Sequence, residues 1–255
     1  MALKRITRKF LRSLGLDVRR YTPSAATLLQ RLFELYRVDT ILDVGANAGQ
    51  SGEHFRSIGF THKMVSFEPI KYLFEKLKDK AQSDPLWFVE NVALGRSECQ
   101  AEINVSGGHA GASSILEMTE NVITHAPKQQ VVRKELIEVS TLDAILNKYY
   151  PENDRCFLKL DVQGYEKSVL EGGLSCIDRV VGMKIELSLV ENYKGETLFL
   201  EMLPFLYSLG FRLVCFENGW GNSVTGELYQ VDCTLFRTNL VSGTKQLASR
   251  IPATK

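Results

Sequence analysis

The stretch ILDVGANAGQ (residues 41–50) decides the fold, and VSFEP (residues 65–69) complements it downstream. The first stretch predicts a short buried strand that enters a glycine-rich turn and then a helix. The second predicts the next strand, with the carboxylate of Glu68 at its end. A strand, a glycine turn, a helix and an acid at the tip of the following strand form the arrangement in which a doubly wound sheet holds an adenosine cofactor. The two stretches therefore predict such a sheet.

The glycine spacing of the turn indicates which adenosine cofactor is bound. A dinucleotide fingerprint needs Gly-x-Gly-x-x-Gly so that the backbone can approach a pyrophosphate, but the chain, aligned on Gly45, has Asn47 and Gln50 at the second and third positions. Asp43 stands just before the turn, where a carboxylate would repel a phosphate and attract a cationic amino group. S-adenosylmethionine carries that amino group and no phosphate, and its ribose diol needs an acceptor such as Glu68. We therefore predict S-adenosylmethionine rather than NAD.

Predicted strands alternate with predicted helices along most of the chain. Strands at residues 40–44, 63–67 and 86–91 are separated by helical segments, which implies βαβ units and a parallel sheet. A last strand at residues 228–236 follows a short glycine-containing loop, so it is expected to run antiparallel to its predecessor. The fold class is therefore α/β, a Rossmann-like doubly wound sheet whose last strand is antiparallel.

The same pattern divides the chain. We predict an N-terminal helical extension at residues 1–37, a main domain at 38–240 and a C-terminal tail at 241–255. The alternation breaks at about residues 96–140, where strands at 100–105 and 131–139 flank an irregular insertion. The five cysteines contain no CxxC pair, so neither a disulfide framework nor a zinc site is predicted, and a cytoplasmic location is expected.

The first twenty residues hold seven lysines and arginines against one acid, with apolar residues interleaved. A helix here would have one basic and one apolar side, and it is too short and too charged to span a bilayer. Two interpretations stay open: a peripheral membrane-surface helix drawn to anionic lipid or to a lipid-linked substrate, or a helix docked on the domain. Beyond this segment no basic stripe with interleaved aromatic residues appears, so we predict no nucleic-acid partner.

Seven motifs in chain order carry a family resemblance: DVGANAGQ at residue 43, FEP at 67, NVALG at 91, STLDAIL at 140, FLKLDVQGYEKSVLEGG at 157, KIELS at 184 and DCTLF at 232. Together they resemble the FkbM-type S-adenosylmethionine-dependent methyltransferases over residues 38–237. The resemblance implies a seven-stranded sheet whose seventh strand is antiparallel. It also implies O-methylation of a hydroxyl on a sugar, glycolipid or polysaccharide precursor.

Cofactor contacts are expected where the carboxyl ends of the strands meet. Asp43 and Gly45, in the turn that also holds Asn47 and Gly49, are predicted to face the methionine end of the cofactor, and Glu68 to face its ribose diol. The segment that contains Asn91 and Val92 is predicted to lie along the adenine edge.

Asp161, at the end of a buried strand, is the main candidate for chemistry. Because an alcohol is a poor nucleophile until its proton leaves, Asp161 could be the general base, contact the cofactor or orient the acceptor. His109 in the insertion is a second candidate for the base. Ser113, Ser114 and Glu186 are candidates for binding the acceptor, and no metal site is predicted.

The leading hypothesis is therefore methylation of a hydroxyl-bearing small molecule or glycan. Methylation of another small metabolite, on oxygen or nitrogen, is an alternative on the same scaffold. An NAD-dependent oxidoreductase and a binding module without catalysis are more distant alternatives. The sequence does not predict the oligomeric state.

Overall fold

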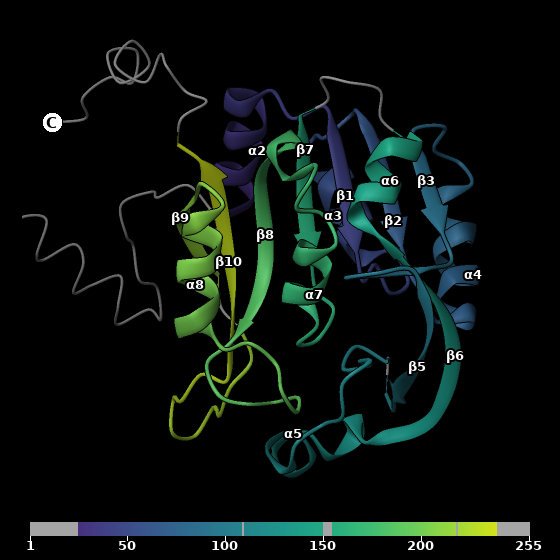
Figure 1. Cartoon of the computed structure of the whole chain (residues 1–255), viewed down its shortest axis with the longest axis vertical. Helices are drawn as coiled ribbons and strands as arrows, with labels where there is room; N and C mark the ends of the chain where they lie inside the picture. The colour runs from purple at the N-terminus through teal and green to yellow at the C-terminus, as the bar shows by residue number, and fades with distance from the viewer. Residues whose placement is uncertain (1–24, 109, 150–154, 218, 239–255) are drawn as a thin grey trace, which may run out of the picture.

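The computed structural model of the 255-residue chain describes residues 25–108, 110–149, 155–217 and 219–238 (Figure 1). The predicted basic helix of residues 1–20, the tail at 241–255 and His109 lie outside the described residues. In the described part of the chain, no helix is long and apolar enough to cross a membrane.

A seven-stranded sheet occupies the centre of the described structure, with strand order β3-β2-β1-β7-β8-β10-β9. Its strands are β1 (Thr40–Val44), β2 (Lys63–Phe67), β3 (Trp87–Glu90), β7 (Cys156–Leu160), β8 (Val180–Ser188), β9 (Phe211–Glu217) and β10 (Gln230–Arg237). The neighbouring strands β3, β2, β1, β7 and β8 pair in parallel. Strand β10 runs antiparallel to both β8 and β9. This confirms the predicted fold class, the seven strands and the antiparallel last strand.

Helices cover both faces of this sheet (Figure 1). On one face α2 (Ala25–Tyr36), α3 (Gln50–Ser57) and α4 (Lys71–Ala81) pack on side chains such as Ile41 and Phe157. On the other face α6 (Leu142–Tyr149), α7 (Glu166–Glu171) and α8 (Phe199–Ser208) pack on side chains such as Leu42 and Leu158. Because both faces are covered, β1 and β7 are buried along their whole length, which explains their nearly continuous apolar sequences.

A smaller sheet stands at the carboxyl ends of the parallel strands (Figure 1). It consists of β4 (Ala93–Gly95), β5 (Cys99–Ser106) and β6 (Val131–Thr141), in the order β4-β6-β5. Between β5 and β6 the chain forms α5 (Glu120–His125) and a 3₁₀ turn, η1 (Pro127–Gln129). Strands β5 and β6 agree with the two predicted strands, whereas β4 and α5 were not predicted because three-residue and six-residue elements leave too little periodicity.

On the sheet face that α2 and α3 cover, the side chains change from apolar to polar toward the carboxyl ends of the strands. At its amino end the side chains are apolar, including Ile41 and Phe157. Two residues further along the same strands stand Asp43 and Lys159, which are register partners. Because strand side chains alternate between faces, this step of two keeps both polar residues on the same face. Lys184 of β8 is the register partner of Lys159 and extends the polar row.

Candidate functional site

The glycine turn after β1 touches the end of β7. Gly45 has φ +75, and a Cβ built on it would lie 1.9 Å from the carbonyl oxygen of Asp161. The amides of Gly45 and Ala46 both donate to the Phe67 carbonyl at the end of β2 (3.1 and 3.0 Å). A residue without a side chain is therefore required for the ends of β1, β2 and β7 to meet at one point.

Glu68 organises the same turn from the end of β2. One carboxylate oxygen accepts the amide N–H of Asn47 and the other accepts that of Ile70, each at 2.8 Å. Asn47 adopts φ +51, a left-handed conformation that asparagine tolerates better than most residues. Glu68 is only 4% exposed, and burial raises its pKa to about 7 despite these hydrogen bonds and the positive charge of Lys159.

These elements surround a first cleft with about 680 Å³ of empty space, its mouth included. Seven of the predicted site residues line it: Gly45, Asn47, Glu68, Val92, Ser113, Ser114 and Asp161. Its other walls are mainly apolar and include Ile70, from the turn after β2, and Ile103 of β5. The first cleft is thus an apolar slot with a few polar groups at the strand ends, which is the usual form of a small-molecule site.

The prediction that Asp43 faces a bound cofactor is corrected by its burial. Its side chain has no exposed surface and does not line the first cleft. Oδ2 accepts the hydroxyl of Ser66 (3.1 Å), and Oδ1 lies 3.3 Å from the ammonium of Lys159. The latter contact is an ion pair without hydrogen-bond geometry, since Oδ1 has no hydrogen-bond partner. Asp43 therefore supports the base of the site from within the sheet.

Gly49 and Asn91, which were also predicted to contact the cofactor, do not line the first cleft but contact residues around it. Gly49 (φ +86) begins α3, and its Cα faces the side chains of Leu77 and Trp87. Asn91 donates through its amide nitrogen to the carbonyl oxygens of Glu68 and Pro69, both at 2.9 Å. Both hold the backbone of the cleft in place, because one permits a left-handed turn and the other ties two loops together.

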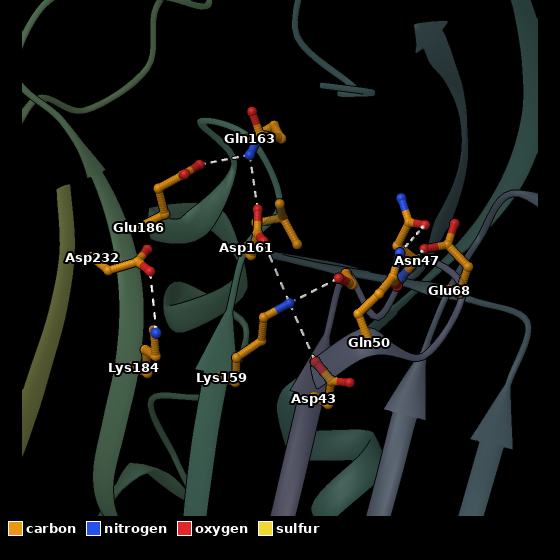
Figure 2. A network of polar contacts seen from close by, with 12 residues as sticks. Asp43, Asn47, Gln50, Glu68, Lys159, Asp161, Gln163, Lys184, Glu186 and Asp232 are labelled. Carbon is orange, nitrogen blue, oxygen red and sulfur yellow. Dashed lines mark hydrogen bonds and ion pairs between the residues drawn. The ribbon is translucent and has the colours of Figure 1, made fainter. Parts of the chain in front are cut away.

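Lys159 is the residue that sequence reasoning missed. Its side chain is buried, and its ammonium donates to the Gly45 carbonyl (2.9 Å) and lies 3.3 Å from Asp43 and 3.5 Å from Asp161 (Figure 2). Burial alone would lower the pKa of Lys159, but the carboxylates of Asp43 and Asp161 more than offset this and raise it above its ordinary value. A lysine inside the apolar strand sequence FLKL was the available signal, because a buried charge needs a partner.

Gln163 links Asp161 to Glu186. Its Nε2 donates to Asp161 Oδ1 (2.8 Å) and to Glu186 Oε2 (2.6 Å; Figure 2). Its Oε1 accepts the hydroxyl of Tyr193 (2.7 Å). Gln163 has φ +56, so these contacts hold a strained backbone position. Burial, and then the neighbouring carboxylates of Asp161 and Glu166, raise the pKa of Glu186 well above its ordinary value.

The segment between β5 and α5 covers the first cleft. The hydroxyl of Ser114 donates to the Gln163 carbonyl (2.7 Å), and that of Ser113 donates to the Ala110 carbonyl (2.8 Å). The carbonyl of Ala112 lies 3.0 Å from the Tyr193 hydroxyl, as an alternative acceptor to Gln163. Both predicted serines therefore line the cleft while their hydroxyls fix the covering segment.

Asp161 also lines a second cleft, with about 730 Å³ of empty space including its mouth. This second cleft lies on the α2 and α3 side of the sheet and is lined by Lys159, Leu160 and Asp161 of the β7 end, by Lys184, Glu217 and Asp232, and by residues of α2 and α3. Glu186 was predicted to bind the acceptor, but it lines neither cleft and contacts Gln163 and Gln230. Figure 2 shows Lys184 and Asp232 beside Lys159.

Comparison with known families agrees with this architecture. The model of the methyltransferase FkbM domain matches residues 43–213, which is more than half of the chain. The chain belongs to the FkbM methyltransferase family. The match runs from Asp43 in β1 to Leu213 in β9 and so includes Asp161, which lines both clefts, and Lys159. This FkbM protein is therefore a methyltransferase, as the resemblance implied.

Solved structures with similar folds are distant from this FkbM methyltransferase. An rRNA methylase from Streptococcus thermophilus is 10% identical, with 86% of this chain and 99% of that chain covered and a TM-score of 0.43. The METTL16 methyltransferase domain is 11% identical, with 91% and 77% covered and a TM-score of 0.46. No curated protein sequence matches the chain.

Proposed function

We propose that the chain transfers a methyl group from S-adenosylmethionine to a hydroxyl of a sugar, a glycolipid or a polysaccharide precursor. The observation that carries the proposal is the position of Asp161, whose carboxylate lines both the first and the second cleft. A residue at such a boundary can touch a cofactor on one side and an acceptor on the other. Asp161 keeps 42% of its side chain exposed, so its carboxylate is accessible to both.

The donors and acceptors of the first cleft fit S-adenosylmethionine. After accepting one N–H each, both oxygens of Glu68 keep lone pairs for the two hydroxyls of a ribose. The apolar side chains of Ile70, Val92 and Ile103 offer a wall for a purine ring. At the other end, Gly45 and Asp161 lie together, where a carboxylate favours a cationic sulfur and a cationic amino group. When bound, S-adenosylmethionine supplies a methyl group activated by its positive sulfur.

Asp161 is proposed as the group that accepts the proton of the acceptor hydroxyl. One of its oxygens accepts the side-chain amide of Gln163, and the other lies beside the ammonium of Lys159. These two partners fix the direction of the carboxylate, which in-line displacement requires because the hydroxyl oxygen must be aligned with the methyl carbon. Lys159 carries the proton throughout, since its pKa is raised, and it therefore orients Asp161 and does not act as a base.

The alternative functions would need a different cofactor site or less help from a base. An NAD-dependent oxidoreductase would need a pyrophosphate beside the β1 turn, yet Asn47 stands where the second glycine is required. Methylation of an amine would need less help from a base, and a binding module would need none. The contacts that hold Asp161 in place favour a reaction in which a proton is removed.

Calorimetry with S-adenosylhomocysteine and with NADH tests the cofactor, and tight binding of NADH alone would refute the proposal. Asp161→Asn tests the base: turnover should be abolished while affinity for S-adenosylhomocysteine stays within about tenfold of wild type. A loss of affinity well beyond about tenfold would show that Asp161 acts mainly in binding the cofactor and not as the base. Asp178→Asn is a matched control, because Asp178 is 97% exposed and lines neither cleft.

We propose a cytoplasmic location with reversible contact to a membrane surface through residues 1–20. Seven basic residues in this segment would be attracted to anionic lipid, where each contributes about 1 kcal/mol near the surface. Such contact would bring the enzyme to a lipid-linked acceptor.

A further inference from the structure

The second cleft has no role in holding the proposed cofactor, yet it is built from polar side chains of five elements. Its lining includes Lys184, Glu217 and Asp232 from three strands and Gln50 and Ser51 from the start of α3. We infer that the second cleft is the acceptor site and that it binds a neutral, polyhydroxylated ring such as one sugar residue. This inference rests on the proposed function and names the acceptor subsite for it.

The two clefts adjoin at two points. Asp161 lines both of them. On the opposite side, Asn47 of the first cleft accepts a hydrogen bond at Oδ1 from Gln50 Nε2 of the second (3.4 Å; Figure 2). Asp161 therefore belongs to both the space for a cofactor and the space for an acceptor. A hydroxyl held in the second cleft beside Asp161 would face the first cleft.

The charges of the second cleft are matched within the protein. Lys184 lies 3.1 Å from Glu217 and 3.2 Å from Asp232. Lys159 lies between Asp43 and Asp161. Because each lysine that lines the cleft already has two carboxylate partners, neither offers a free positive charge to a phosphate or a carboxylate. A strongly anionic acceptor would also meet three acidic side chains, so a neutral ligand fits better.

The same side chains suit a ligand rich in hydroxyl groups. Lys184, Glu217 and Asp232 keep between 23% and 30% of their side chains exposed, so donors and acceptors alternate along an accessible wall. A sugar hydroxyl both donates and accepts, and neighbouring hydroxyls can pair with neighbouring donors and acceptors of this kind. Ser51 and His54 on α3 add further polar atoms to the lining. A wholly apolar acceptor would leave these polar groups without partners, which is unfavourable, and the apolar side chains of Leu29 and Phe55 complete the lining.

Ser51→Trp tests the site by filling the second cleft from α3. Ser57→Trp is the matched control, because Ser57 lies on the same helix, is exposed and does not line the cleft. The probes are the methyl glycosides of the common neutral hexoses and 6-deoxyhexoses, with methyl phosphate as the anionic comparison. Saturation-transfer NMR in the presence of S-adenosylhomocysteine measures binding to the full chain.

We expect at least one methyl glycoside to bind the wild type and the Ser57→Trp variant, and its signal to fall by about tenfold or more in Ser51→Trp. Methyl phosphate should give no signal that Ser51→Trp removes. Absence of binding by every glycoside, equal binding to both variants, or preferred binding of methyl phosphate in the cleft would each overturn the inference. Calorimetry with S-adenosylhomocysteine on the same samples separates this outcome from failure of the proposed function, since only the latter predicts lost cofactor binding in the wild type.

Discussion

Replacing Lys159 by methionine should destabilise the protein strongly, because it leaves Asp43 charged and buried. The methionine keeps the length of the side chain and removes the ammonium that lies 3.3 Å from Asp43 Oδ1. Asp43 has no exposed surface, and its remaining polar partner is the hydroxyl of Ser66. Removing one partner of a buried ion pair costs about 3–5 kcal/mol. Total stabilities of folded domains are about 5–15 kcal/mol, so the variant should stay folded at low temperature but with a much lower unfolding midpoint.

Urea unfolding followed by tryptophan fluorescence measures this loss. Trp87 is a local probe, because its indole N–H donates to Ser66, the residue that binds Asp43. Lys184→Met is the matched control: its ion pairs are more exposed than those of Lys159, so its loss should be smaller. Adding Asp43→Asn to Lys159→Met removes the unpaired charge and should recover part of the stability. Equal losses for the two lysine variants, or a double variant less stable than Lys159→Met alone, would refute the reasoning.

Three further outcomes follow from the site and one from the N-terminal segment. Burial raises the pKa of Glu68 to about 7. Affinity for S-adenosylhomocysteine should therefore rise about tenfold from about pH 6 to about pH 8, because the carboxylate ionises over this range. Calorimetry should show that Glu68→Gln binds S-adenosylhomocysteine more weakly and without this pH dependence. The raised folded-state pKa also means that the stabilising contribution of protonated Glu68 is lost between about pH 4.5 and about pH 7, so the urea midpoint of the wild type should fall over this range more than that of Glu68→Gln. Gly45→Ala should lower the free energy of unfolding by more than about 2 kcal/mol. The control Gly195→Ala should lower it less, because Gly195 also has a positive φ (+74) but no atom lies within 4 Å of an added Cβ. Equal losses would show that the contact with Asp161 is unimportant. Deleting residues 1–20 should reduce sedimentation with anionic vesicles but not with neutral ones, and unchanged binding would favour the docked-helix interpretation.

The fold was predictable because its signals are local and repeated. The central parallel strands β1, β2 and β7 are short apolar runs, and each is followed by a turn and a helix, as at Val44 and Gly45. The smaller sheet was only partly predictable. Strands β5 and β6 were predicted, whereas the three residues of β4 are defined by pairing with distant Val139 and not by their own sequence.

The site was predictable to the level of strand ends and no further. A residue at the end of a parallel strand is near the crevice, which correctly brought Glu68 and Asp161 to the first cleft. Which way a side chain points depends on its partners across the sheet, and this is why Asp43 lies beneath the site, paired with Lys159. A buried lysine and a buried aspartate on adjacent strands could have been paired from the sequence alone. The left-handed backbone at Gln163 had no comparable signal, because glutamine rarely adopts it.

The hydrogen bond from Ser114 to Gln163 has a consequence for the timing of the reaction. It joins the segment that covers the first cleft to the turn that carries Asp161, and the Tyr193 hydroxyl, which reaches both Gln163 and Ala112, reinforces the connection. Lifting this segment would break these hydrogen bonds and disturb the residue that positions Asp161. Under the proposed function, release of the spent cofactor and the ordering of Asp161 are therefore coupled.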